Sequence, residues 1–301
     1  MTDTRLIDGK EFAAKLRKKI KHRTAVLKAK HGLVPGLAAV LVGEDPASQV
    51  YVRNKERACA AVGMHAETIK LPELSTQDEI LSVINRLNED NRFHGILLQL
   101  PLPKHIDEGM MLRAINPGKD VDCIHPVNVG LLSQGESHFL PATPGGIQKL
   151  LIRNGHNPSG KHLVICGRSN IVGKPLAIMM AQKRNGANAT VTVCHTGTQN
   201  MSYITAQADI LVAAVGFPNA ITADMVGSGA IVIDVGINRV EDKTRKTGYR
   251  LVGDVDFDNV SDKVMAISPV PGGVGPMTIA QLLVNTLTSA QLVTGEKLNS
   301  I

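Results

Sequence analysis

Residues 36–62 decide the fold, and they read GLAAVLVGEDPASQVYVRNKERACAAV. Residues 36–43 are an apolar run, which is typical of a strand buried on both faces of a parallel sheet. A short polar link follows, and a helix is expected from about Ser48 to Val62. A buried strand that leads into a helix predicts one βα unit of an α/β fold.

The same alternation continues through the first half of the chain. Residues 65–71 and 95–100 are expected as further strands, and residues 75–90 as a helix with Ser75 as its N-cap. The resulting order is βαβαβ, which implies a parallel sheet with helices on both of its faces.

The second half repeats this pattern with strands of its own. Residues 141–146 (PATPGG) are rich in turn formers and separate the halves, and residues 278–293 are expected as a helix that returns to the first half. The expected strands are residues 162–166, 190–194, 209–215, 230–235 and 264–267. A chain of 301 residues with this order predicts two α/β domains.

Composition and charge narrow the classes of function. Much of the net charge of +6 lies in residues 10–30, where apolar residues at helical spacing indicate an amphipathic helix with a solvated basic face. Nucleic-acid binding is the alternative interpretation, but few aromatic residues accompany the charge. A basic surface is also suited to anionic small substrates. No stretch approaches the ~20 apolar residues of a membrane span.

The positions of the cysteines indicate in which cellular compartment the protein is expected. They lie at positions 59, 123, 166 and 194 and form no C-x-x-C pair, so we expect reduced thiols and neither disulfides nor a metal site. Residues 1–9 contain no apolar signal-peptide core. The sequence therefore predicts a cytoplasmic enzyme.

Tyr51 and Lys55 form the first candidate site. In a helix they are four residues apart and lie on one face, with Ser48 one turn earlier on the same stripe. An aromatic ring beside an ammonium group can stack on a planar ring and transfer a proton to it. The alternative interpretation is a surface helix with an extended lysine side chain.

A nucleotide site is the second candidate. The expected strand 162–166 runs into Gly167-Arg168-Ser169-Asn170-Ile171-Val172-Gly173 and then into a helix. Gly167 permits a tight turn, Gly173 permits close helix packing, and the helix N-terminus is expected to present N–H groups to a pyrophosphate. The spacing is not G-x-G-x-x-G, since Ser169 replaces the second glycine. An ordinary strand–turn–helix connection is the alternative.

The next strand end indicates which dinucleotide is bound. NAD sites place an Asp or Glu there to bind the ribose 2′-hydroxyl group, but residues 185–200 contain no acid. With Arg168 nearby, the site is expected to accept the 2′-phosphate of NADP. The alternative is that Arg168 only caps its loop, in which case NAD remains open.

A series of short motifs runs through nearly the whole chain in a fixed order. They are Tyr51-Val52-x-x-Lys55; Asp78-Glu79-Ile80 with 87–90 (LNED) and 96–102 (ILLQLPL); 119–122 (KDVD); 167–173; 234–238 (DVGIN); and 271–279 (PGGVGPMTI). Each motif alone is moderately specific, and the complete set is highly specific. In these motifs the chain resembles the bifunctional methylenetetrahydrofolate dehydrogenase/methenyltetrahydrofolate cyclohydrolase family.

The resemblance implies a fold and a division into domains. It implies an N-terminal three-layer α/β domain that binds folate and carries catalysis, over residues 1–146 and completed by the C-terminal helix 277–301. It also implies a C-terminal Rossmann-like domain that binds NADP, over residues 147–276.

The resemblance also implies roles for individual residues. The tyrosine matching Tyr51 stacks on the folate ring system, and the lysine matching Lys55 is the central catalytic group. Gln99 is then the residue that positions the lysine, and Asp122 the residue that binds the pterin edge. The other implied residues are Ser48, Leu100, Pro271, Gly272 and Gly275 for the substrate and Gly167, Arg168, Ser169, Ile171, Thr196 and Ile237 for the cofactor, with no metal ligands.

The implied activity has two steps. NADP oxidises 5,10-methylenetetrahydrofolate to the 5,10-methenyl form, and hydrolysis of that cation gives 10-formyltetrahydrofolate, in the one-carbon metabolism that serves purine biosynthesis. The family also implies a homodimer whose nucleotide domains face each other, and residues 230–235 offer an apolar strand for such a contact. Neither nucleic acid nor a membrane is expected as a partner.

The sequence departs from the family pattern at a few positions. Cys123 stands where the family usually has Gly, and Ala142 replaces a frequent Cys. The segment His195-Thr196-Gly197 lacks the basic residue that is often found there, which weakens the predicted 2′-phosphate site.

Two other classes of protein are the alternatives. A shikimate-type dehydrogenase on a similar scaffold would lack the set Tyr51, Lys55, Gln99 and Asp122. A folate- or nucleotide-binding regulator without turnover would be expected to lose Lys55 first, and Lys55 is present.

Overall fold

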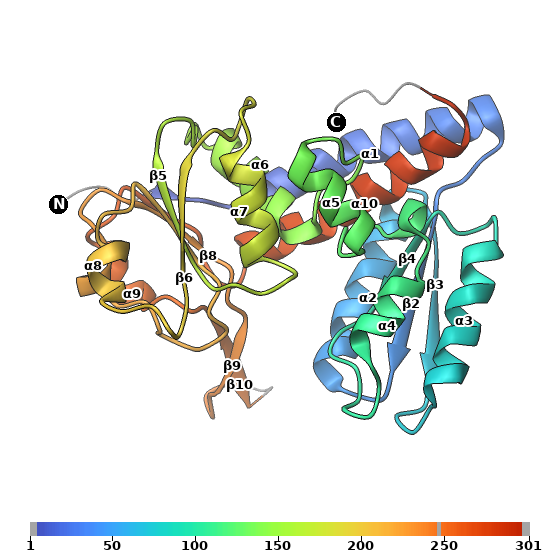
Figure 1. Ribbon diagram of the computed structural model, residues 1–301, viewed down its shortest axis with the longest axis horizontal. Helices are drawn as coiled ribbons and strands as arrows, with labels where there is room; N and C mark the ends of the chain where they lie inside the picture. The colour runs from blue at the N-terminus through green and yellow to red at the C-terminus, as the bar shows by residue number, and fades with distance from the viewer. Residues whose placement is uncertain (1–4, 246–247, 297–301) are drawn as a thin grey trace. The chain divides into compact units, whose positions relative to one another are not determined.

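The computed structural model describes residues 5–245 and 248–296 of the chain (Figure 1). The chain forms two compact units. Residues 14–142 and 279–301 form the first unit, and residues 1–13 and 143–278 form the second unit. The domain limits implied by the family resemblance stay a prediction.

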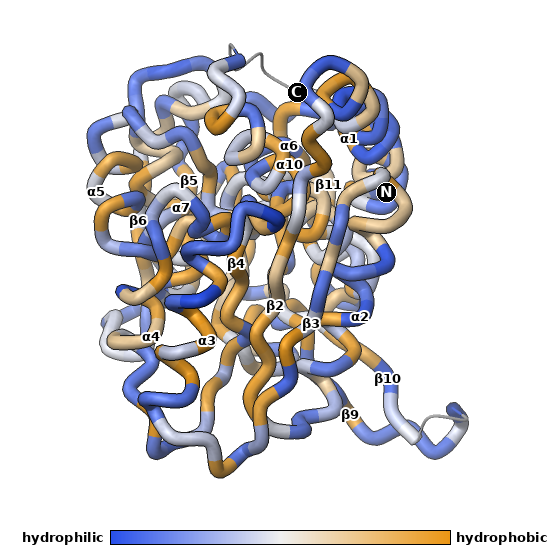
Figure 2. Tube along the Cα trace, turned by 90° about the vertical axis from the view of Figure 1, so that its right-hand side faces the viewer, coloured by the Kyte–Doolittle hydropathy of each residue, from blue (hydrophilic) through white to orange (hydrophobic). Residues whose placement is uncertain are grey.

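The first unit contains a three-stranded parallel sheet in the order β3-β2-β4. The central strand, β2 (Gly36–Val42), is buried along its whole length, which explains its apolar sequence and its mostly orange trace in Figure 2. It pairs with β3 (His65–Leu71) and β4 (Gly95–Leu98). The crossovers are the helices α2 (Pro46–Ala61) and α3 (Gln77–Glu89). The predicted βαβαβ order is confirmed.

The start of α3 differs from the prediction. Thr76, and not Ser75, is the N-cap, and its hydroxyl oxygen accepts a hydrogen bond from the Glu79 backbone N–H at 3.2 Å. The Glu79 carboxylate accepts the Thr76 backbone N–H at 2.8 Å and completes a capping box. Ser75 lies one residue earlier and is buried.

The basic segment predicted near the N-terminus is the helix α1 (Gly9–His31). It buries Ala13, Leu16, Ile20 and Leu27 along one stripe, while most of its lysines and arginines are exposed. The remaining helical elements up to residue 134 are α4 (Glu108–Ala114), the 3₁₀ turn η1 (Pro117–Lys119) and α5 (Pro126–Gln134). The part of α10 (Val274–Val293) from residue 279 onward also belongs to the first unit.

The second unit contains a six-stranded parallel sheet in the order β1-β11-β8-β7-β5-β6. Its strands are β1 (Arg5–Leu6), β5 (His162–Cys166), β6 (Thr190–Cys194), β7 (Ile210–Ala213), β8 (Ile231–Asp234) and β11 (Ala266–Ile267). Its helical elements include α6 (Ala142–Arg153), α7 (Gly173–Ala181), α8 (Met201–Thr205), η2 (Ala223–Met225) and α9 (Phe257–Ser261). A separate antiparallel hairpin joins β9 (Asn238–Glu241) to β10 (Tyr249–Val252).

The position of β8 corrects one expectation. β8 lies between β7 and β11 inside the sheet, and three of its four residues are buried. Its apolar character therefore comes from packing in the core, and the prediction that residues 230–235 offer a surface to a partner is wrong. The two edge strands of this sheet are β1 and β6.

Candidate active site

The first unit brings two of the predicted catalytic residues into direct contact. Lys55 lies on α2, and its Nζ donates a hydrogen bond to Gln99 Oε1 at 3.0 Å. Gln99 follows the carboxyl end of β4, and its backbone N–H donates to the Val40 carbonyl oxygen at 2.9 Å. The Gln99 amide nitrogen donates to the Leu100 carbonyl oxygen at 2.7 Å, which fixes the amide with its oxygen toward the lysine.

Lys55 and Asp122 influence each other's protonation. Burial lowers the pKa of Lys55, and the charge of Asp122 opposes this shift. Burial raises the pKa of Asp122 to about 6, an effect that Lys55 opposes and Asp120 reinforces. Loss of water draws each group toward its neutral form, while the charge of each stabilises the charge of the other. A lysine in this setting can exchange a proton closer to neutral pH than an exposed one.

Tyr51 lies one turn before Lys55 on α2, as the spacing predicted. The residue is 37% exposed and therefore offers a surface to a ligand. Ser48, at the start of the same helix, is buried, and its backbone N–H donates to the carboxylate of the N-cap Asp45 at 2.7 Å. The helix therefore places an aromatic ring and an ammonium group next to each other, which is suited to a flat substrate with polar edges.

The loop that carries Asp122 is shaped by a neighbouring carboxylate that sequence reasoning did not single out. Asp120 is buried and accepts hydrogen bonds from the backbone N–H groups of Ile124 at 3.3 Å and His125 at 2.8 Å. It also accepts one from Asn128 Nδ2 at 2.8 Å. These bonds fold the chain tightly around Asp122, so Asp120 orients the loop through the backbone.

The last helix holds the same loop from a second side. Asn285 of α10 is buried, and its Nδ2 donates to the carbonyl oxygens of Val121 and Leu140, each at 2.7 Å. The Ser289 hydroxyl donates to the Gly118 carbonyl oxygen at 2.8 Å. Sequence reasoning did not single out Asn285, although a buried asparagine in an apolar helix needs hydrogen-bond partners.

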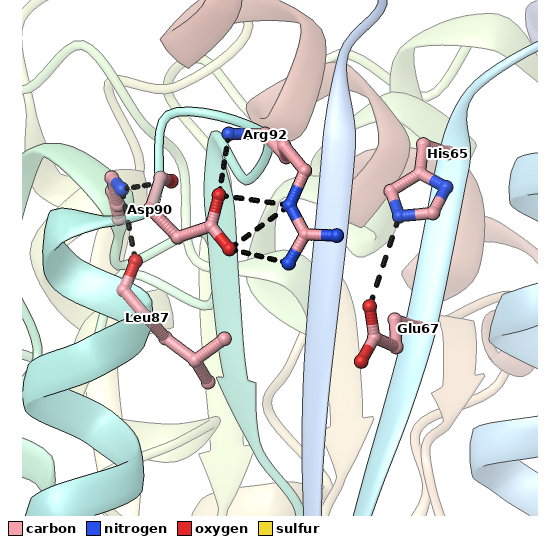
Figure 3. A network of polar contacts seen from close by, with 6 residues as sticks. His65, Glu67, Leu87, Asp90 and Arg92 are labelled. Atoms are coloured by element: carbon pink, nitrogen blue, oxygen red, sulfur yellow. Dashed lines mark hydrogen bonds and ion pairs between the residues drawn. The ribbon is translucent and has the colours of Figure 1, made fainter.

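Lys119 attaches the start of this loop to the end of α3. Its Nζ donates to the carbonyl oxygens of Leu87 at 3.0 Å and Asp90 at 2.9 Å. Figure 3 shows these two carbonyl groups next to the ion pair between Arg92 and Asp90, whose shortest contact is 2.6 Å. These contacts precede β4, at the opposite end of that strand from Gln99, so we assign them a structural role.

Cys123, the departure next to Asp122, has a positive φ of 57°. This left-handed conformation is unfavourable for a residue with a side chain and explains why the family usually has glycine there. The chain retains the turn because the buried Cys123 side chain packs below it, with Sγ 3.6 Å from the Phe139 carbonyl oxygen.

In the second unit, the turn after β5 has the close packing that a nucleotide site needs. Gly167 has a φ of 131°, and a Cβ on it would lie 2.1 Å from the Ala214 carbonyl oxygen. A Cβ on Gly173 would lie 2.0 Å from the Gly167 carbonyl oxygen. Both positions therefore require glycine, and the backbone forms a compact turn over the sheet edge.

The expected N–H donors at the start of α7 are already used within this turn. The Ser169 hydroxyl accepts the N–H groups of Val172 at 3.1 Å and Gly173 at 3.4 Å, and the Ser169 carbonyl oxygen accepts that of Lys174 at 3.1 Å. The next residue, Pro175, has no N–H group. The prediction that the helix N-terminus itself presents free donors is therefore wrong.

The donors that this turn offers precede the helix. Arg168, Ser169 and Ile171 are exposed, and within residues 5–245 and 248–296 their backbone N–H groups have no hydrogen-bond acceptor. A short run of such N–H groups is suited to an anion, so the turn fits the pyrophosphate of a dinucleotide. The exposed guanidinium group of Arg168 adds a cation at the same place.

The segment that follows β6 is where the sequence predicted a site for the 2′-phosphate group of NADP. Thr196 and Gly197 are exposed, and the Gly197 backbone N–H donates to His195 Nδ1 at 3.1 Å. The Thr198 hydroxyl accepts the His195 backbone N–H at 2.9 Å. This segment carries no acid that would select the 2′-hydroxyl group of NAD.

Gly275, one of the residues implied for the substrate, lies next to the predicted cofactor residue Ile237 within the second unit. A Cβ on Gly275 would lie 3.7 Å from Ile237 Cδ1. A Cβ on Gly272, whose φ is 122°, would lie 3.1 Å from Lys10 Cε. Gly275 therefore packs against Ile237, which belongs to the loop that follows β8.

Two further findings concern metal-binding clusters and membrane-spanning helices. Within the described ranges, no three His, Cys, Asp or Glu side chains gather closely enough to hold a metal ion. No helix in the described part of the chain combines the length and apolar character needed to cross a bilayer.

Comparisons with known proteins match both halves of the chain. Residues 7–122 match the catalytic domain of tetrahydrofolate dehydrogenase/cyclohydrolase, and residues 141–294 match its NAD(P)-binding domain. The bifunctional protein FolD of Prosthecochloris aestuarii is 57% identical over 94% of this chain and 97% of its own length. The corresponding protein of Chlorobium chlorochromatii is 55% identical over 96% and 99%.

Solved structures agree in fold. The bifunctional FolD dehydrogenase/cyclohydrolase of Campylobacter jejuni is 49% identical, with a TM-score of 0.90 over 96% of this chain and 99% of that one. The enzyme of Trypanosoma brucei, complexed with NADP and an inhibitor, is 40% identical, with a TM-score of 0.93 over 98% and 99%.

Proposed function

Since this chain belongs to the tetrahydrofolate dehydrogenase/cyclohydrolase family, we propose that it carries out both reactions of that family. It oxidises 5,10-methylenetetrahydrofolate with NADP and hydrolyses the resulting 5,10-methenyl cation to 10-formyltetrahydrofolate. The observation that carries this proposal is the partly buried Lys55 ammonium, bonded to Gln99 and coupled in charge to Asp122. The products serve one-carbon metabolism.

The oxidation requires little acid–base catalysis by the protein. NADP, when bound, accepts the hydride that leaves the methylene carbon, and the flanking nitrogens of the folate stabilise the cation that remains. The chain mainly binds and aligns the substrate. Tyr51 stacks on the pterin, and Asp122 bonds its polar edge.

The hydrolysis depends on proton transfer, and Lys55 is the residue that we assign to it. Water adds to the methenyl carbon and loses a proton, N5 gains a proton as its bond to that carbon breaks, and the remaining hydroxyl proton leaves to give the formyl group and one released proton. A lysine with a lowered pKa can accept the first proton and return one to N5. The hydrogen bond to Gln99 Oε1 holds the ammonium group in one position between these transfers.

The preference for NADP is expected to depend on Arg168. Arg168→Ala should raise KM for NADP far more than KM for NAD, because only NADP has a 2′-phosphate to bind. A charge-assisted hydrogen bond to phosphate contributes about 1.5–3 kcal/mol, equivalent to about 10- to 100-fold in affinity. Gly197 supplies no second cation at the β6 end, so the preference should depend largely on Arg168.

Initial rates with each dinucleotide measure this effect, and Lys174→Ala is the matched control on the same turn. The Lys174 ammonium already donates to Asn170 Oδ1 at 2.8 Å, so its loss should change both KM values alike. If Arg168→Ala weakens NAD and NADP equally, the arginine contacts the pyrophosphate or holds the loop.

We propose that the enzyme is a homodimer, as the family resemblance implies. The edge strand β6 supports this proposal, because one side of it pairs with no other described strand. Sedimentation at micromolar concentration should give twice the mass of one chain. A monomer under those conditions would contradict the proposal.

We also propose that the enzyme works in the cytoplasm. All four cysteines, at positions 59, 123, 166 and 194, are free and buried, and burial raises the pKa of Cys59, Cys123 and Cys166 to about 12. Such thiols are inert and are typical of a reducing compartment.

A rate assay on the purified protein tests the proposed function. With 5,10-methylenetetrahydrofolate and NADP, the absorbance of the reduced nicotinamide should rise in proportion to enzyme concentration. A protein that binds both ligands without turnover would be the regulator considered above. No change with either NADP or NAD would overturn the assignment.

A further inference from the structure

Two buried carboxylates in the second unit have no part in the chemistry described so far. Asp234 ends β8 and is 2% exposed, and Asp254 follows β10 and is fully buried. Within the described ranges, neither forms an ion pair with a lysine, arginine or histidine. Buried charges without a counter-ion are costly, so their hydrogen-bond partners indicate what they do.

Asp234 holds the segment that contains Asp254. Its Oδ1 accepts the backbone N–H groups of Gly236 and Asp254, each at 2.9 Å, and its Oδ2 accepts that of Val255 at 3.0 Å. The Ser268 hydroxyl accepts the backbone N–H of Asp234 at 2.8 Å. Asp234 therefore fixes the backbone from which the Asp254 side chain projects.

Asp254 reaches the ends of two neighbouring strands. Its Oδ2 accepts the backbone N–H groups of Val215 at 2.6 Å and Gly216 at 2.8 Å, which follow β7. Its Oδ1 accepts Asn238 Nδ2 at 2.9 Å, in the segment that follows β8. One carboxylate thus ties together the loops after β7 and β8, at the edge where doubly wound sheets bind their ligands.

The backbone packs closely against both carboxylates. A Cβ on Gly236 would lie 2.1 Å from Asp254 Oδ1, and one on Gly253 would lie 1.7 Å from Asp234 Oδ2. Ile237 lies between Gly236, which Asp234 holds, and Asn238, which Asp254 holds. Its side chain nevertheless remains 42% exposed. The carboxylates therefore lie below a surface that Ile237 presents outward.

The same bonds decide what kind of group this surface can receive. The N–H groups of Val215 and Gly216 point inward to Asp254, so they are not available to a phosphate. Val215 and Phe217 are 40% and 68% exposed. Together with Ile237 they present apolar contacts, which are suited to the face of a planar ring.

From these contacts we propose that Asp254, supported by Asp234, is a positioning residue for the nicotinamide end of NADP. It holds Ile237 and the segment 215–217 in the arrangement that receives the ring. The nicotinamide end is assigned because Ile237 also borders Gly275, one of the residues implied for the substrate. This inference rests on the proposed function, since it concerns the cofactor of that reaction.

Asp254→Asn tests the proposal by direct titration with NADP in a calorimeter. The amide can still accept the N–H groups of Val215 and Gly216, but its NH₂ group then faces Asn238 Nδ2, donor against donor. We expect the Kd for NADP to rise about 10-fold or more, as for loss of a hydrogen bond to a charged group. Loss of a negative charge would by itself strengthen the binding of an anionic cofactor. Weaker binding would therefore indicate that Ile237 and the segment 215–217 have lost their position.

The KM values for the two substrates distinguish a loss of cofactor positioning from a general structural defect. KM for NADP should rise while KM for 5,10-methylenetetrahydrofolate stays within about twofold of the wild type, because the carboxylate contacts only cofactor loops. Asp209→Asn is the matched control. Asp209 accepts the His162 backbone N–H at 2.8 Å at the opposite end of β5 and β7, and its loss should leave Kd for NADP unchanged.

Asn238→Ala is the second variant, and it decides the question if Asp254→Asn does not fold. It removes the amide that Asp254 holds and leaves the backbone carboxylate bonds in place, so Kd for NADP should again rise. If the folded variants bind NADP as tightly as the wild type, the proposed positioning role is overturned. If the wild-type protein itself fails to bind NADP, the proposed function falls and this inference with it.

Discussion

Lys55→Met is expected to reduce the hydrolysis of 5,10-methenyltetrahydrofolate by about 10²- to 10⁴-fold, the range that a general acid–base group contributes. Methionine fills a similar volume but can neither accept nor donate a proton. Gln99 cannot take over, because an amide does not exchange protons near neutral pH. Oxidation by NADP should survive in part, since hydride transfer depends on alignment of the reactants. Rates of the two reactions on one preparation give both numbers.

The same substitution should change the pH dependence of thermal stability. Burial lowers the pKa of Lys55, so the folded state disfavours the ammonium form relative to the unfolded chain. This penalty is present at pH values below the folded-state pKa and disappears as the pH rises above the unfolded value of 10.5. Methionine removes this penalty but also the hydrogen bond to Gln99 and the charge that stabilises Asp122. We therefore expect the Tm of the variant, relative to the wild type, to be higher at neutral pH than in alkaline buffer.

Lys28→Met is the control, because Lys28 lies on the exposed face of α1 and should affect neither rate. A Lys55→Met protein that hydrolyses the methenyl substrate at the wild-type rate would show that another group transfers the proton.

Gly167→Ala is the second substitution for which we expect a large effect. It should impair the use of NADP and leave the hydrolysis nearly unchanged, the opposite of Lys55→Met. The residue has a φ of 131°, and the added Cβ would lie 2.1 Å from the Ala214 carbonyl oxygen, so the turn after β5 must move. Such strain costs about 1–3 kcal/mol before the clash is added. We expect kcat/KM for NADP to fall by about 100-fold or more, since a shift of about 1 Å in a binding element can have that effect.

Hydrolysis of the methenyl substrate in the absence of dinucleotide should change little in Gly167→Ala, because Lys55, Gln99 and Asp122 all belong to the first unit. Gly155→Ala is the matched control: its φ is also positive, at 81°, but the space around it is open. Parallel loss of both activities in Gly167→Ala would indicate a folding defect and contradict this division of roles.

The parts of the fold that the sequence predicted are those set by local pattern. Residues 162–166 and 190–194 are β5 and β6 with the predicted bounds. The β5 run lies between Lys161 and Gly167, and the β6 run ends before His195. The hairpin β9–β10 was missed, since its strands are only partly buried and carry charges. β1 was missed as well, because a strand of two residues is defined only by its pairing with β11.

The residues of the candidate site also divide into those that the sequence predicted and those that it did not. The pair Lys55 and Gln99 was expected from motif positions, and a hydrogen bond joins them. Asp120, Asn285 and Asp254 were not singled out. Their contacts join segments far apart in the chain, as when Asn285 binds the Val121 carbonyl oxygen. Sequence spacing carries no signal for such contacts, and only the folded chain reveals which polar groups are buried together.

Product analysis of one reaction tests the central claim, that this single chain carries both activities. The purified protein is given 5,10-methylenetetrahydrofolate and NADP, and NADPH and 10-formyltetrahydrofolate are quantified over time. We expect both products to form in equal amounts at completion, and well ahead of the spontaneous hydrolysis of the methenyl intermediate. NADPH formation with the methenyl form disappearing only at its uncatalysed rate, or no NADPH at all, would contradict the account.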